Sequence, residues 1–147
     1  MINQDANRLP EVVDCLWDPD ACVRMRAADA LEKLSRDSAS RLQPFKNPLL
    51  DLAAESKQKE VRWHLALIVP RLCLTNSECA QAAELLESYL NDRSSIVKTC
   101  AMQGLADLAQ KYIALRPGVT DLIHMLAKTG TPAMRARGRI LLKGWPA

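Results

Sequence analysis

The chain has 147 residues, of which 48% are hydrophobic, 25% are charged and 4% are aromatic, and its net charge is +3. This length is typical of one domain with its own core, and the scarcity of aromatic residues argues against a sheet-rich protein, because strands favour aromatic and β-branched side chains. So small a positive surplus does not by itself indicate a nucleic-acid or membrane-binding protein. We therefore expect an all-α fold.

Apolar residues recur at helical spacing along the first half of the chain, and turn signals separate the runs. The first run, 9–17, ends at Asp18-Pro19-Asp20, where proline stops one helix and aspartate starts the next. Two prolines interrupt the run 42–54, so we expect its helix to begin at Asn47-Pro48. The run from Val61 to Leu74 is apolar on nearly every side.

The second half continues the pattern. Ser77 and Glu78 predict the N-terminus of a helix that reaches Leu90. Pro117-Gly118 precedes a later helix and Gly130 follows it. The first helices of four predicted pairs thus lie in the runs 9–17, 42–54, 77–90 and 119–127, and the second helices follow from Val23, Val61, Val97 and Met134.

The chain contains an internal repeat. Four segments align without gaps from Val23, Val61, Val97 and Met134, at separations of 38, 36 and 37 residues. The residues eight positions after these starts are all apolar: Leu31, Val69, Leu105 and Leu142. Such a period predicts antiparallel helix pairs that share a continuous core. We expect one domain, 1–147, with repeats at 7–37, 41–75, 76–113 and 117–145.

The repeated pattern Asp18-x5-Arg24-x2-Ala27-x3-Leu31-x2-Leu34 resembles the HEAT repeats, in their short bacterial form, which is also called phycobilisome-lyase-like. The resemblance covers residues 9–145 and implies a right-handed α-solenoid of the armadillo/HEAT type, with four helix pairs. Because such repeats serve scaffolds, lyases, glycosylases and hydroxylases alike, it implies little about function.

The resemblance also implies a structural ladder, in which a turn aspartate reaches a basic residue of a neighbouring repeat. The pair is kept as Asp18 with Arg24 and as Asp92 with Lys98, whereas Ser56 and Thr129 replace the acid in the other two turns. The ladder residues are Asp18, Arg24, Arg62, Asp92, Lys98 and Arg135.

The side of each second helix that faces away from the predicted core is the expected binding face. In the second repeat this side is apolar, and Trp63 is the expected anchor for a partner. The predicted partner-binding residues are Met25, Trp63, Leu67, Leu74, Gln103, Arg139 and Ile140. An alternative is that this side is buried, through curvature or through a kink at Pro70.

The last quarter of the chain is basic. Arg135, Arg137, Arg139 and Lys143 lie in the last predicted helix, where they are suited to phosphate groups or an acidic protein. The alternative is a solvated terminal cap.

No motif for catalysis or for a metal site is visible, and we expect no cofactor. The sequence favours a non-catalytic adaptor that binds another protein on its concave surface. The alternatives are nucleic-acid binding through the basic C-terminal helix and a lyase- or glycosylase-type enzyme subunit, for which no catalytic residue stands out. Five cysteines without C-x-x-C spacing suggest free, mostly buried thiols and a cytoplasmic location, and we expect no membrane span. The uncapped ends of the predicted stack allow self-association.

Overall fold

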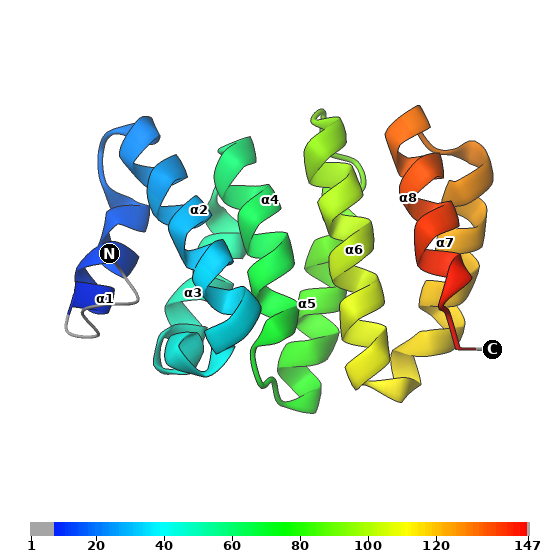
Figure 1. The fold of residues 1–147 in the computed structure, drawn as a ribbon, viewed down its shortest axis with the longest axis horizontal. Helices are drawn as coiled ribbons and strands as arrows, with labels where there is room; N and C mark the ends of the chain where they lie inside the picture. The colour runs from blue at the N-terminus through cyan, green and yellow to red at the C-terminus, as the bar shows by residue number, and fades with distance from the viewer. Residues whose placement is uncertain (1–7, 147) are drawn as a thin grey trace. The chain divides into compact units, whose positions relative to one another are not determined.

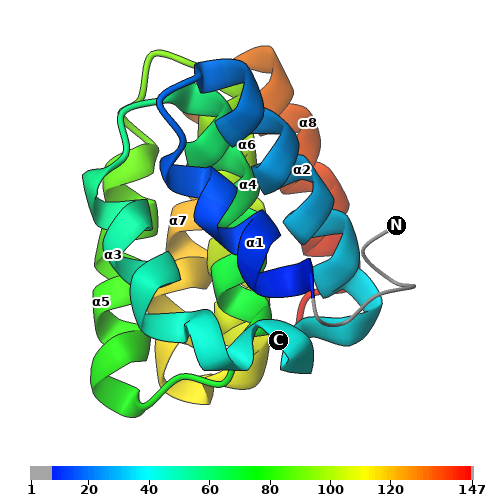
Figure 2. The same cartoon turned by 90° about the vertical axis from the view of Figure 1, so that its left-hand side faces the viewer.

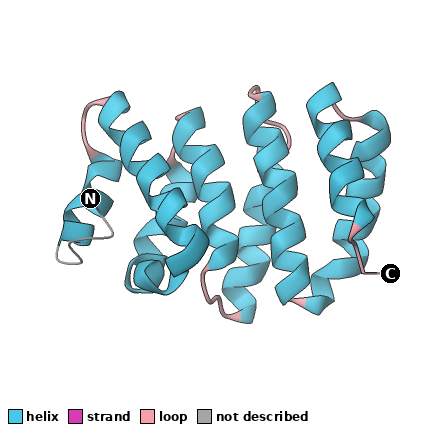
Figure 3. Ribbon diagram, in the orientation of Figure 1, coloured by secondary structure: helices cyan, strands magenta, loops and turns pink. Residues whose placement is uncertain are grey.

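A computed structural model describes residues 8–146, and within this range the chain forms helices and turns without a strand (Figure 3). The all-α prediction is confirmed. The α-helices are α1 (Leu9–Asp14), α2 (Ala21–Ser38), α3 (Lys46–Glu55), α4 (Lys59–Ile68), α5 (Asn76–Tyr89), α6 (Ser95–Lys111), α7 (Arg116–Thr129) and α8 (Pro132–Lys143). Short 3-10 turns are η2 (Cys15–Trp17), η3 (Ala39–Phe45), η4 (Val69–Arg71) and η5 (Ile113–Leu115).

The helices divide into two compact units, with the boundary between Cys73 and Leu74. This boundary lies close to residue 75, the predicted end of the second repeat. In the first unit α2 and α4 pack side by side, and α3 packs against α4 (Figure 1). Figure 2 shows α2 and α3 on opposite sides of α1. The core of this unit includes Leu16, Leu31, Leu42, Leu49 and Leu65, all fully buried.

In the second unit, α6 packs against α5 on one side and α8 on another, and α7 packs along α8 (Figure 1). Leu86, Met102, Leu105, Leu108 and Ile123 are fully buried in its core. Each unit therefore contains two consecutive helix pairs, and in each the second helices of the two pairs lie next to each other.

The second helix of every pair begins at the same position in the repeat. The N-cap residues of α2, α4, α6 and α8 are Asp20, Gln58, Ser94 and Thr131, which are 38, 36 and 37 residues apart. Three of them cap through a side-chain oxygen that accepts a backbone N–H, and Gln58 does not. The helix starts thus follow the spacing of the sequence repeat.

The turns before α2 and α4 share a second interaction. Arg24 Nη1 donates to the carbonyl oxygen of Asp18 at 2.7 Å, and Arg62 Nε donates to that of Ser56 at 2.6 Å, six residues back in both cases. The Arg24 side chain also reaches the next repeat, because its Nε donates to Gln58 Oε1 at 2.8 Å. Gln58 Nε2 in turn donates to the carbonyl oxygen of Ala21.

At the first two turns of the predicted ladder, the arginine thus binds a backbone carbonyl oxygen of the turn. The Asp18 and Asp92 carboxylates accept the backbone N–H two residues on, at 2.9 and 2.8 Å, so they shape their own turns. Because the arginine binds a carbonyl oxygen, Ser56 replaces aspartate without loss of the contact. Lys98 is half-buried near the start of α6, and Arg135 is exposed near the start of α8.

Some predicted boundaries were wrong. Helix α4 ends at Ile68 and not near Leu74, because Pro70 follows in a 3-10 turn and has no N–H to continue the helix. The N-cap of α5 is Thr75, in a capping box with Glu78, and not Ser77. Helix α3 begins at Lys46, one residue before the predicted cap.

At the C-terminal end, Pro117-Gly118 lies inside the first turn of α7. Trp145 lies beyond α8, where its indole Nε1 donates to Thr120 Oγ1 at 2.6 Å.

The cysteines are only partly as expected. Cys79 is buried, and burial raises the pKa of its thiol. Cys15 and Cys100 are half-buried, whereas Cys22 and Cys73 are exposed, so the prediction of mostly buried thiols was wrong. None of the helices in the described part of the chain is long and apolar enough to cross a membrane.

Candidate functional site

The face formed by α2 and α4 in the first unit carries the predicted anchor. Trp63 and Leu67 lie one turn apart on α4, and both are half-buried, as is Met25 on α2. The indole of Trp63 stacks on the imidazole of the buried His64, with the ring centroids 3.5 Å apart and an angle of 26° between the planes. Trp63 is therefore neither a fully buried core residue nor a free surface side chain.

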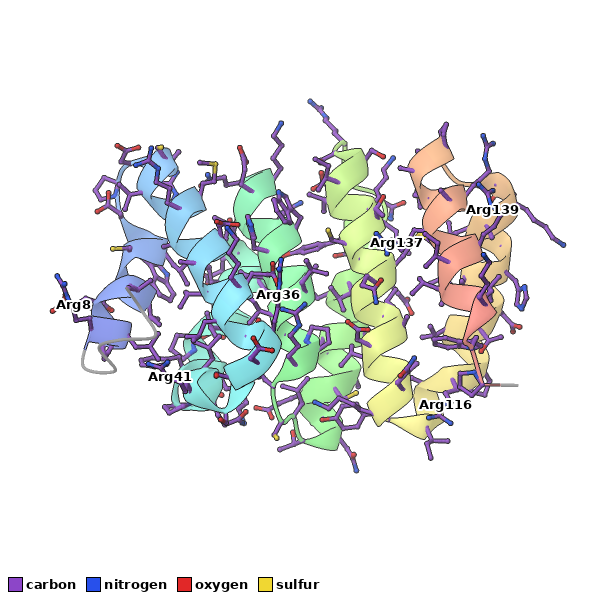
Figure 4. All side chains as sticks on the ribbon, viewed as in Figure 1. Arg8, Arg36, Arg41, Arg116, Arg137 and Arg139 are labelled. Atoms are coloured by element: carbon purple, nitrogen blue, oxygen red, sulfur yellow. The ribbon has the colours of Figure 1, made fainter. Side chains whose placement is uncertain are left out.

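A buried carboxylate on α2 ties this helix to the turn that follows α4. The Glu32 side chain, on α2, is 3% exposed and accepts hydrogen bonds from Arg36 Nη2 at 2.6 Å and from Arg71 Nη1 at 2.6 Å. Arg36 lies one turn further along α2, and Arg71 follows α4 in η4. Figure 4 shows the labelled Arg36 beside the seam between α2 and α4.

Arg71 makes further contacts with α2. The same Nη1 atom lies 2.7 Å from Ser35 Oγ and 3.1 Å from the carbonyl oxygen of Glu32. Ser35 is also buried, and its hydroxyl donates to the Glu32 carbonyl oxygen at 2.7 Å. This cluster fixes the end of α4 against the last turns of α2.

The pKa of Glu32 reflects two opposed effects. Burial raises the pKa, because a charged carboxylate is poorly solvated there, but hydrogen bonds from Arg36 and Arg71 and their positive charges lower it more. The net result is a pKa of about 2 against an ordinary value of 4.5. Glu32 is therefore ionised at neutral pH and holds two guanidinium groups on this face.

His64 connects α4 to α2 at a second place. Its Nδ1 donates to the carbonyl oxygen of Glu60 at 2.5 Å, and its Nε2 lies 3.4 Å from Asp29 Oδ1 without forming a hydrogen bond. Asp29 also accepts from Lys33 Nζ at 2.9 Å, and this hydrogen bond lowers the pKa of the Asp29 carboxyl. Two acidic residues, Asp29 and Glu32, thus pair with two basic residues of α2, Lys33 and Arg36, and each acid also lies within 4 Å of a side chain from α4 or η4.

Leu74 does not belong to this face. The prediction placed Leu74 on the exposed side of one long helix. It is only 9% exposed, and it lies outside α4, which ends at Ile68. Its backbone N–H and carbonyl both bond to the hydroxyl of Tyr112, each at 3.0 Å. Pro70 is buried as well, so the apolar surface of this region ends near Leu67.

The other predicted partner-binding residues lie in the second unit. Gln103 on α6 is half-buried, and its side chain donates to Asp107 Oδ1 at 3.0 Å and accepts from Arg137 Nη1 at 3.4 Å. Ile140 on α8 is 58% exposed, and Arg139 is exposed beside it. The predicted partner-binding residues are therefore divided between the two units.

The basic residues of α8 separate into two groups. Arg137 points toward α6, where it contacts Gln103, whereas Arg139 lies on the side of α8 away from α6 (Figure 4). Arg135, Arg139 and Lys143 are all exposed and are spaced four residues apart, so they form one stripe along the helix.

The buried network around Glu32 was not predicted from the sequence. The i, i+4 spacing of Glu32 and Arg36 signals an ion pair, but the third member, Arg71, lies 39 residues away in sequence from Glu32. Only the packing of α2 against α4 brings it close. Among residues 8–146, no group of three or more histidine, cysteine or acidic side chains is arranged to hold a metal ion.

Comparisons with known proteins provide no functional assignment, so any assignment rests on the residues described above. No protein-family model matches the chain, and no significant relative is found among curated proteins.

Proposed function

We propose that this protein is a HEAT-like α-solenoid that acts as a cytoplasmic, non-catalytic adaptor and binds a protein partner on the face of its second helices. The proposal rests on the sequence repeat and on the N-caps of the second helices, which recur at the spacing of that repeat. Its site is the α2–α4 face, with Trp63 as the anchor.

One observation carries the proposal: a half-buried tryptophan and leucine lie beside a polar network that holds the helices in place. Trp63 is fixed by stacking on His64, and Glu32 fixes the end of α4 through Arg71. A rigid aromatic side chain on a preorganised surface loses little entropy on binding, which is typical of a binding hot spot.

The expected partner is a helix or an extended segment with an apolar anchor and acidic flanks. Its anchor packs against Trp63 and Leu67. The Arg36 side chain is 58% exposed although two of its nitrogens bind Glu32, so it has donors left for a partner carboxylate.

The test is affinity capture from source-cell lysate with wild type, Trp63→Glu and Trp17→Glu, after nuclease treatment and at high salt. Trp17 is the matched control, because it lies in the same unit and is 47% exposed but is not on the proposed face. We expect wild type and Trp17→Glu to retain the same protein and Trp63→Glu to lose it. Circular dichroism of the three proteins should show the same helical content.

Equal retention by the Trp63 and Trp17 variants would contradict the proposed face. Loss of the helical signal in Trp63→Glu would show that the fold requires Trp63. Leu67→Glu would then test the same face.

A second candidate function is the binding of a nucleic acid by α8, because Arg135, Arg139 and Lys143 form an exposed stripe. Residues 122–147 contain no acidic residue that would oppose such binding. Phosphate contacts weaken steeply with salt, whereas apolar burial does not. Retention that nuclease or salt abolishes, and that Arg139→Glu removes, would favour this function over the adaptor.

A further inference from the structure

A shallow groove of about 660 Å³ runs between α5 and α7 in the second unit. Its apolar floor includes Leu90 and Leu122, which lie partly buried over the core residues Met102, Leu126 and Met134. Met125, on the same side of α7 as Leu122, is 51% exposed at the groove. An exposed thioether beside partly covered leucines marks an apolar surface suited to a partner.

The wall of the groove is acidic. Glu84 and Glu87 lie on α5, one turn apart, and both are exposed. The described residues that line the groove include no lysine or arginine. The groove therefore favours a segment that presents an apolar side chain next to positive charges.

The exposed face of α8 has this chemistry. Ile140 is 58% exposed, and Arg139 and Lys143 are exposed next to it on the same side of the helix. The opposite side of α8 is already packed within its own unit, through the buried residues Met134 and Gly138. The exposed side of α8 is thus available to another molecule.

We propose that the α5–α7 groove binds the exposed face of α8 from a second copy of this chain. Ile140 of one copy packs against Met125 of the other, while Arg139 and Lys143 pair with Glu84 and Glu87. The two surfaces differ, so the contact is heterologous: the copy that supplies α8 keeps its groove, and the copy that supplies the groove keeps its α8 face for further contacts. One helix in a shallow groove is a small interface, so association is expected at micromolar or higher concentrations.

The proposal is independent of the adaptor function, because it uses neither Trp63 nor the α2–α4 face. Its test is sedimentation velocity of the purified full chain over a range of concentration and salt. Wild type should associate as concentration rises, and added salt should weaken the association, because exposed charge pairs are screened. Glu84→Lys/Glu87→Lys and Arg139→Glu/Lys143→Glu should each be monomeric, because each brings like charges together.

Mixing the two charge-reversed chains gives the decisive result. The acidic helix of one then meets the basic groove of the other, and the remaining helix and groove keep their original charges. Association should therefore return in the mixture while neither chain associates alone. The control is Asp51→Lys/Glu55→Lys, which reverses two exposed acids on α3 and should associate like wild type.

Three results would overturn the proposal. The first is a wild-type chain that stays monomeric up to about 1 mM. The second is association that persists in both charge-reversed chains. The third is a mixture of the two that remains monomeric although both are folded by circular dichroism.

Discussion

Glu32 is the residue on which the candidate face most depends. Its carboxylate is buried between the side chains of Arg36 and Arg71, which come from different elements. Removing one member of such a cluster leaves the remaining charges without their partner. The binding face and the stability of the first unit are thus linked through one side chain.

We expect Glu32→Gln to lower the free energy of unfolding by about 2 kcal/mol at neutral pH, because both arginines lose a charged acceptor. Arg36→Gln should cost less than Glu32→Gln, since the Arg36 side chain is mostly exposed and Arg71 still neutralises Glu32. Urea unfolding of the two variants measures the difference. A smaller loss for Glu32→Gln than for Arg36→Gln would contradict this account of the network.

The low pKa of Glu32 predicts a pH dependence of stability. A carboxyl whose pKa falls on folding, from 4.5 to about 2, stabilises the protein fully above its unfolded pKa. This stabilisation is lost as pH falls from about 5 toward 2. The gap in stability between wild type and Glu32→Gln should therefore narrow over this range. Unfolding curves at several pH values test it, and a gap that stays constant would argue against an ionised Glu32.

At the scale of elements, Gly138 marks a close approach between α7 and α8. A Cβ at this position would lie 2.8 Å from Ala127 Cβ and 3.1 Å from Ala127 Cα, too close for either helix to keep its place. We expect Gly138→Ala to destabilise the protein by about 1–3 kcal/mol, although alanine favours helix.

Gly118→Ala is the matched control, because Gly118 is also helical, in the first turn of α7, and a Cβ there meets nothing within 4 Å. This change should be neutral or stabilising by less than about 1 kcal/mol. Thermal unfolding compares the two variants. Equal stability for both would show that α7 and α8 do not pack closely at Gly138.

The sequence predicted where the second helices start better than where they end. The starts carry local signals, such as Asp20 and Ser94, whose side chains cap the helices that follow. Helix α4 ends at Ile68 because Pro70 interrupts an otherwise apolar run. Apolar periodicity alone does not predict this end. As a result, Leu74 was placed on a helix that does not reach it.

The same contrast applies to the candidate site. Trp63 and Leu67 follow from helical spacing within one segment, and both lie at the surface of α4 as half-buried residues. Arg71 joins Glu32 from 39 positions away, through tertiary packing that no local pattern encodes. Arg137 likewise points away from the other basic residues of α8, because it donates a hydrogen bond to Gln103 on α6.

At the scale of the whole molecule, charge is unevenly distributed along the chain. Residues 1–38 contain five basic and eight acidic residues, whereas residues 113–147 contain six and one. The apolar α2–α4 face and the basic stripe of α8 thus have different chemistry and different expected salt dependence. A partner on the first should stay bound at high salt, whereas a polyanion on the second should not.

The most direct test of the adaptor proposal is to locate the bound partner. Hydrogen exchange, measured on the free protein and on its captured complex, reports which backbone amides the partner protects. We expect slower exchange in residues 21–38 and 59–71, which form α2, α4 and the turn that carries Arg71. Protection confined to α8, with α2 and α4 unchanged, would contradict the proposal and place the binding site on the basic helix.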